Sequence, residues 1–160
     1  AVELLLKREP KSKMTIELTT TVNFQDEGEE IKREWEALGS DTTNACKRKK
    51  ELAKKIECDN FGLSVSLRVT NFPDLSNYQT MLIAQQIPKD PDQYFLWHST
   101  QSTNFMHYKS PRIDKLLEDG RKEQDKDQRA AIYQDFQQFL VEESPAIFLT
   151  HPTEFTIERK

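Results

Sequence analysis

The sequence predicts an α/β fold, in which strands and helices alternate along one chain. Two segments, 14–22 and 63–69, alternate apolar with polar residues at the two-residue period of a strand. Between and after them, apolar residues recur every three or four positions, as in helices. The 160 residues are 36% hydrophobic and 31% charged, which is typical of a globular chain long enough to bury a core.

The first part of the chain is predicted to be helix, strand and helix. Residues 1–9 resemble the last turns of a helix that a proline ends, and 14–22 follow as a strand. Asp26 followed by Glu29 resembles a capping box, in which the two side chains bond to free N–H groups at a helix start. We expect this helix to end at Gly39, because glycine suits the position just after a helix.

The middle of the chain adds a peripheral helix and two strands. The basic segment 44–57 is predicted to be the helix, and 63–69 the second strand of the sheet. A turn at Pro73 leads into a short helical stretch over 74–79. Residues 80–84 are apolar enough for a short buried strand.

Two helices and two short strands complete the expected order. Pro111 suits the first position of a helix, where its missing N–H leaves no hydrogen bond unmade. Asp125 caps a longer helix that ends before Pro145. Short strands are expected at 146–149 and 155–157.

The composition and the missing motifs exclude several classes of protein. A net charge of −4 argues against a nucleic-acid surface, which needs clustered Lys and Arg. The longest apolar runs hold four residues, far short of the roughly 20 that span a bilayer, so we expect no transmembrane segment. Only four glycines are present, and their positions permit neither a dinucleotide fingerprint nor a phosphate loop. We expect no cofactor.

One basic run and two cysteines interrupt this acidic background. Lys47 to Lys55 hold six basic residues and one Glu, and we interpret the run as a solvated helix face, with an anionic partner as the alternative. Cys46 and Cys58 flank the run and lack the spacing of a zinc or redox motif. They are therefore inert thiols or one disulfide, and export of the protein would favour the disulfide.

Residues 85–108 are predicted to be mostly irregular, and irregular segments that carry aromatic residues often bind ligands. This segment combines flat rings with neutral hydrogen-bonding groups, as small-molecule and peptide pockets do. We expect Phe95 in the core, whereas Trp97 is left open between core and ligand contact. The candidate ligand-binding residues are Gln85, Gln86, Asp90, Asp92, Tyr94, Trp97, His98, Asn104 and Tyr108.

The same residues give little reason to expect catalysis or a metal. His98 with Asp90 and Asp92 is a conceivable metal site, but Asp-Pro-Asp in a turn more often caps the backbone. A nucleophilic triad through Ser99 and His98 is weaker, since neighbours in sequence seldom face one another. We expect no metal, no catalytic residue and no enzyme, and rank a metal-dependent hydrolase last.

Four blocks carry a resemblance to a known family. They are 90–99, 104–117, 129–133 and 145–149. By their order and spacing, the chain from residue 80 to its end resembles the C-terminal lobe of family 5 extracellular solute-binding proteins. These are the peptide- and nickel-binding components of ABC importers. The strand 14–22 and the helix to Gly39 also resemble this lobe, while 40–60 look like an insertion.

The resemblance implies a periplasmic-binding-protein type II-like lobe over 1–160, with a mixed sheet flanked by helices. It implies that the chain is a fragment of a receptor that clamps its ligand between two lobes. The implied partners are a peptide or other small solute, the remaining lobe and an ABC permease, outside the cytoplasm in the periplasm or lipid-anchored at the cell surface. Ile87 stands near the place where peptide-binding members carry an aspartate for the peptide's amino group, which favours a neutral or differently charged ligand.

A different class of protein remains as the alternative. The basic helix 47–55 and exposed aromatic residues would suit a free-standing domain that binds a protein partner. That alternative predicts that the basic helix matters more than Trp97.

Overall fold

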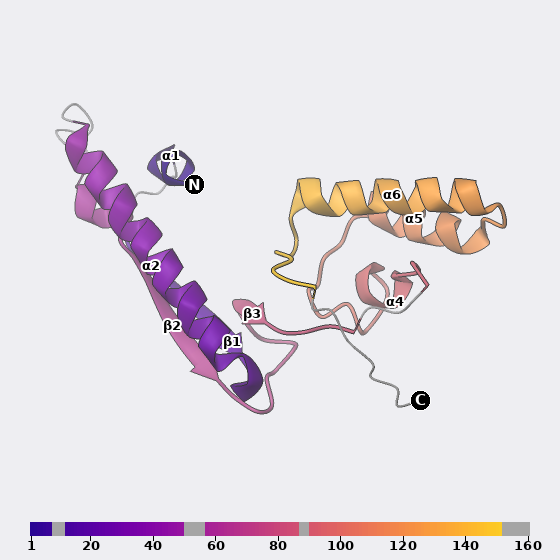
Figure 1. Ribbon diagram of the computed structural model, residues 1–160, viewed down its shortest axis with the longest axis horizontal. Coiled ribbons are helices and arrows are strands. Elements are labelled where there is room, and N and C mark those ends of the chain that lie inside the picture. The colour runs from indigo at the N-terminus through magenta and orange to yellow at the C-terminus, as the bar shows by residue number, and fades with distance from the viewer. Residues whose placement is uncertain (8–11, 50–56, 87–89, 152–160) are drawn as a thin grey trace, which may run out of the picture. The chain divides into compact units, whose positions relative to one another are not determined.

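The computed structural model describes four stretches of the chain, 1–7, 12–49, 57–86 and 90–151. The chain forms two compact units, Ala1–Gln86 and Ile87–Lys160, and each has its own core (Figure 1). The expectations of a single lobe over 1–160 and of an insertion at 40–60 stay predictions. The strand expected at 155–157 lies outside the described residues, as does most of the basic helix 47–55.

A three-stranded sheet forms the centre of the first unit. β1 (Met14–Thr20) lies between β2 (Leu63–Val69) and β3 (Thr80–Leu82). Both neighbours run parallel to β1, so the sheet is parallel and not mixed over its described strands. The helical connection through α2 carries the chain back to the start of β1 before β2 begins, whereas β3 pairs only with the last three residues of β1. The predicted α/β class is confirmed.

The long helix α2 (Gln25–Arg48) packs along β2, as Figure 1 shows. It continues nine residues beyond Gly39, where the sequence predicts its end. A Cβ atom on Gly39 would lie 2.5 Å from the backbone nitrogen of Leu63, so this glycine permits close packing of helix on strand and is not a cap. The predicted capping box is also wrong: the N-cap is Phe24, and no side chain caps the helix.

A disulfide lies where the end of α2 meets α1 (Val2–Lys7). Cys46 and Cys58 are bonded to each other and buried, in a cluster with Leu6 and Phe61. The bond links the end of α2 to the short helix η2 (Cys58–Phe61) that leads into β2. The disulfide is therefore part of a small buried cluster in the first unit and cross-links two of its members.

The second unit is a pair of packed helices with a short third one. α5 (Pro111–Lys122) packs against α6 (Lys126–Glu143), and α4 (Tyr94–Trp97) lies on α5 (Figure 1). As predicted, Pro111 begins α5, and the Asp125 carboxylate accepts the N–H groups of the second and third residues of α6. The buried residues of this core are Trp97, Ile113, Leu117, Tyr133, Phe136 and Leu140.

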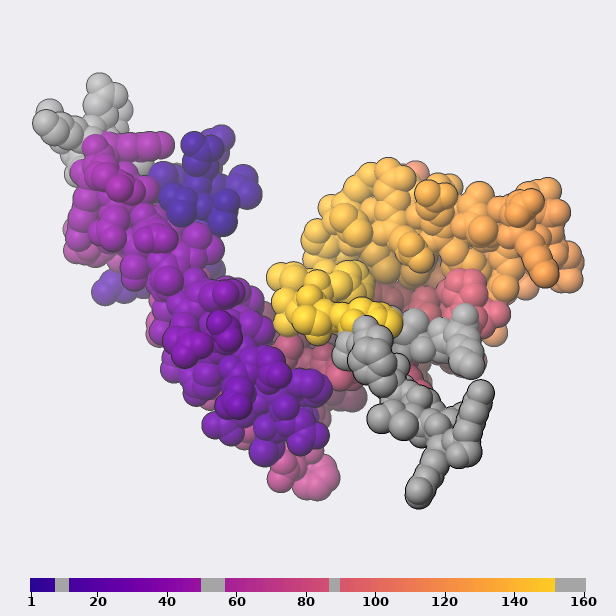
Figure 2. Space-filling view, viewed as in Figure 1, coloured from indigo at the N-terminus to yellow at the C-terminus, as the bar shows by residue number. Residues whose placement is uncertain are grey.

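Two expected elements take a different form. Residues 74–79 are a turn and not a helix, because the Asp74 carboxylate accepts the N–H (2.9 Å) and the hydroxyl (2.6 Å) of Ser76. Residues 146–149 form no strand, since no strand of the second unit's described residues lies beside them to pair with. This segment follows α6 and lies at the surface (yellow in Figure 2), with Ile147 75% exposed.

Candidate functional site

The parallel strands of the first unit all end at one edge of the sheet. The N–H of Thr70, just after β2, donates to the carbonyl of Thr20 at the end of β1 (2.9 Å). The chain passes from β1 to β2 on one side and later enters β3 on the other, so the strand order changes direction between β1 and β3. Open α/β sheets bind ligands outside the strand ends at such a point. Gln85 and Gln86 follow β3 there and are exposed.

The other candidate residues belong to the second unit, where Asp90 and Asp92 shape a turn. Asp90 Oδ1 accepts the N–H of Asp92 (2.8 Å), and Asp92 Oδ1 accepts the N–H of Tyr94 (3.0 Å). The two carboxylates therefore cap the backbone that leads into α4. Backbone capping is the role that the Asp-Pro-Asp pattern predicts in preference to metal binding.

Each of these carboxylates also pairs with an arginine from a helix that follows the turn in the sequence. Two guanidinium nitrogens of Arg129 on α6 lie 2.8 and 3.4 Å from the carboxylate oxygens of Asp90. Arg121 Nε on α5 lies 3.1 Å from Asp92 Oδ2. The hydrogen bond from Arg129 holds the pKa of Asp90 below its usual value, and the N–H of Asp92 acts in the same direction. No sequence signal links these partners, which are far apart in the chain.

The aromatic residues of α4 point in opposite directions. Trp97 is 4% exposed and packs in the core, with its ring centroid 6.3 Å from that of Tyr108. Phe95, expected in the core, is 60% exposed. Residues two apart on a helix point to nearly opposite sides, so burying Trp97 exposes Phe95.

Tyr94 connects the turn to His98. Its ring stacks on the His98 ring with centroids 4.2 Å apart, and the Arg121 guanidinium lies 4.4 Å from the Tyr94 centroid. The same guanidinium lies 5.6 Å from the Phe95 centroid. Arg121 therefore contacts two aromatic rings and one carboxylate, and links α5 to the turn and to α4.

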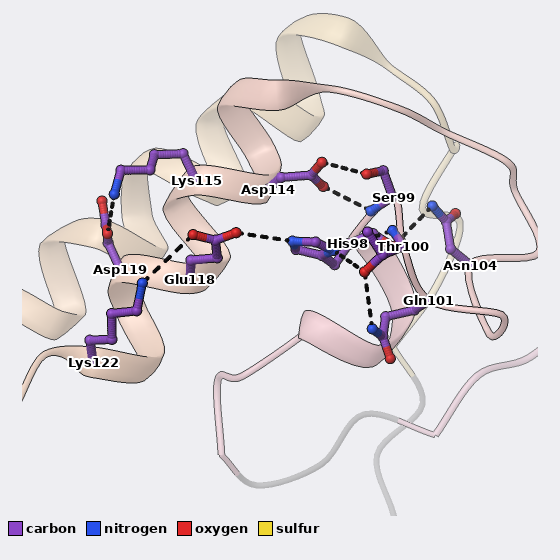
Figure 3. Close-up of polar contacts among 10 residues, drawn as sticks. All are labelled: His98, Ser99, Thr100, Gln101, Asn104, Asp114, Lys115, Glu118, Asp119 and Lys122. Carbon is purple, nitrogen blue, oxygen red and sulfur yellow. Dashed lines mark hydrogen bonds and ion pairs between the residues drawn. The ribbon is translucent and has the colours of Figure 1, made fainter.

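His98 is buried, with a hydrogen-bond partner at one ring nitrogen and a carboxylate near the other (Figure 3). Its Nδ1 lies 2.8 Å from the Thr100 hydroxyl, and its Nε2 lies 3.5 Å from Glu118 Oε1 on α5. The hydroxyl of Ser99 donates to Asp114 (2.5 Å) and not to His98, so these residues do not have the geometry of a nucleophile and its base.

Asn104 makes a hydrogen bond across the loop between α4 and α5. Its amide nitrogen donates to the carbonyl of Tyr108 (2.7 Å), and the side chain is buried. Asn104 Oδ1 and the Tyr108 hydroxyl are buried without a hydrogen-bond partner among the described residues. Both groups can still accept a hydrogen bond, although neither atom is exposed to solvent.

The described stretches of the chain contain no group of three or more His, Cys, Asp or Glu side chains placed to hold a metal ion. They also contain no helix that is long and apolar enough to cross a membrane.

Comparison with solved structures shows which class of protein has this fold. The chain matches the ABC transporter-associated periplasmic binding protein DppA from Helicobacter pylori, in complex with the peptide STSA, with a TM-score of 0.61 and 18% identity. It also matches NikZ from Campylobacter jejuni in complex with Ni(L-His), with a TM-score of 0.52 and 21% identity. These matches cover 90% and 82% of this chain but only 27% and 25% of those chains. The chain has the α/β fold of part of a periplasmic binding protein.

Sequence relatives point to the same class, although no family model matches the chain. Protein XP55 of Streptomyces lividans is 43% identical over 68 residues, or 39% of this chain. The oligopeptide-binding protein AppA of Bacillus subtilis is 30% identical over 79 residues (48%), and the probable di/tripeptide-binding protein 5 of Pseudomonas aeruginosa is 34% identical over 76 (44%). The matched part spans 12% of XP55 and 14% of each of the others. Where these names state a function, they describe binding proteins and not enzymes.

Proposed function

We propose that this chain is part of the extracytoplasmic solute-binding component of an ABC importer, and that its solute is peptide-like. The observation that carries the proposal is that the relatives with a stated function and a structural neighbour of the same fold all bind peptides. The chain spans a small part of each relative, which supports the proposal that it is a fragment of a two-lobed receptor. The remaining lobe and a permease would then be its partners.

The location outside the cytoplasm has its own support. Cys46 and Cys58 are bonded in the structure, and disulfides persist in oxidising compartments such as the periplasm or the cell surface. Whether a lipid anchors the protein there stays a prediction of the family resemblance.

The mechanism we propose is closure of two lobes around the solute. Ligand contacts made only in the closed state shift the equilibrium between open and closed forms, and no bond is broken. On this chain the exposed amides of Gln85 and Gln86 beyond β3 are proposed to supply such contacts. Neutral donors and acceptors of this kind suit the amide groups of a peptide.

Calorimetric titration of the intact receptor tests the proposal. We expect binding of short peptides, and no comparable binding of sugars or nickel chelates. Gln86→Ala should weaken peptide binding several-fold, while Gln137→Ala, an exposed glutamine on α6, serves as the matched control. A folded receptor that binds no peptide in a broad library would contradict the proposal. Binding of a nickel complex alone would show that the solute is not peptide-like.

A further inference from the structure

The candidate segment contains four acidic residues between positions 90 and 118, and every one of them already has protein partners. Two of them are Asp90 and Asp92, which face Arg129 and Arg121. The other two are Asp114 and Glu118 on α5. Their partners determine what a solute meets at this surface.

The turn carboxylates are each engaged twice. Asp90 holds both an arginine and the N–H of Asp92, and Asp92 holds both an arginine and the N–H of Tyr94. The guanidinium beside each carboxylate offsets its negative charge. A solute ammonium group that approached either carboxylate would meet that arginine as a like charge.

The two carboxylates of α5 also have partners within the protein, Asp114 through hydrogen bonds and Glu118 through ion-pair contacts. Asp114 accepts the N–H of Ser99 (2.8 Å) and its hydroxyl (2.5 Å). Glu118 lies between His98 and Lys122, 3.5 Å from the imidazole Nε2 and 3.6 Å from the Lys122 Nζ (Figure 3). The acidic side chains of this segment thus have partners within the protein, whereas the 60% exposed ring of Phe95 offers a neutral apolar surface beside them.

We propose that this segment recognises uncharged parts of its solute, and that Asp90 and Asp92 position the turn without binding a cationic group. This inference rests on the proposed function and narrows it. The segment should accept a peptide with a blocked amino terminus as readily as one with a free ammonium group. Arg121 and Arg129 are the residues that keep the two carboxylates away from the solute.

The test compares one peptide in two forms, with a free and with an acetylated amino terminus, on the intact receptor. The ratio of the two Kd values is measured for the wild type, Asp90→Asn and Asp92→Asn. We expect each substitution to change the ratio less than about threefold, whatever the wild-type ratio is. Because both Kd values come from the same variant, a general loss of stability cancels. Asp119→Asn, a carboxylate paired with Lys115 on α5, is the control.

A selective loss of tenfold or more for the free-amine peptide in Asp90→Asn or Asp92→Asn would overturn the inference. A second variant tests the role of the arginine. Arg121→Gln frees the carboxylate of Asp92, so the free-amine peptide should gain affinity relative to the acetylated one. Lys115→Gln removes a positive charge from the same helix and controls for long-range electrostatics. An equal effect of both variants would overturn the role given to Arg121, and failure of both peptides to bind would instead contradict the proposed function.

Discussion

Gly39 of α2 lies against the backbone of Leu63 at the start of β2, and a Cβ atom there would come within 2.5 Å of the strand nitrogen. A helix and a strand that approach this closely have no room for a side chain between them. Because the obstacle is backbone and not a flexible side chain, it cannot move aside without shifting the sheet.

Gly39→Ala should therefore destabilise the first unit by about 1–3 kcal/mol, the usual cost of overpacking, although alanine favours helices. Urea unfolding followed by circular dichroism measures the change. Gly62→Ala is the matched control, because a Cβ there meets nothing closer than 3.4 Å, and we expect its effect to stay within about 0.5 kcal/mol. Equal stability of Gly39→Ala and wild type would show that the contact is looser than described.

The bond between Cys46 and Cys58 should stabilise the first unit, because it closes a short loop with a sequence separation of 12. The loop-entropy relation gives about 3 kcal/mol for a loop of this size. We expect the double variant Cys46→Ser/Cys58→Ser to lose about this much in urea unfolding. Dithiothreitol should lower the stability of the wild type and leave the double variant unchanged, and equal sensitivity of the two would contradict the prediction.

The pair formed by Asp90 and Arg129 should make the second unit less stable in acid. The pKa of Asp90 is lower in the folded chain than in the unfolded chain, chiefly because Arg129 hydrogen-bonds to the carboxylate. Its contribution is therefore present above about pH 4 and is lost as the pH falls through the folded value.

Thermal unfolding of Asp90→Asn checks this expectation. The variant should melt below the wild type at pH 7, and the difference between the two melting temperatures should shrink as the pH falls below about 4. Asp135→Asn, an exposed carboxylate on the same helix as Arg129, is the control and should show no such convergence. A difference that persists unchanged at pH 3 would mean that the ion pair is not its cause.

Truncation of Trp97 and of Phe95 should have very different effects on the stability of the second unit, although the two residues lie only two positions apart. Trp97→Ala removes a ring that is 4% exposed and should destabilise the second unit by about 3–5 kcal/mol. Phe95→Ala removes a ring that is 60% exposed and should change stability by about 0.5 kcal/mol or less. Chemical denaturation measures both, and comparable losses in the two variants would contradict the described orientation of α4.

Much of the fold follows from local patterns in the sequence. The strands at β1 and β2 were predictable because alternation of apolar and polar residues is itself the requirement for a strand with two unlike faces. The starts of α5 and α6 were predictable for a similar reason. Pro111 and Asp125 act on N–H groups within their own helical turn, so no distant residue is involved.

The sequence by itself determined the α/β class and most element positions, because periodicity and capping depend on neighbours along the chain. Separately, the order of four residue blocks carried the resemblance to solute-binding proteins. Only the tertiary structure decided the rest. Gly39 is typical of a helix end by its position in the sequence, but in the fold it makes room for the backbone of Leu63. The ion pairs of Asp90 and Asp92 depend on arginines from helices that follow much later in the chain. Burial, close packing and charge pairing depend on which residues meet in space, and local sequence patterns do not reveal contacts between residues that are far apart in the chain.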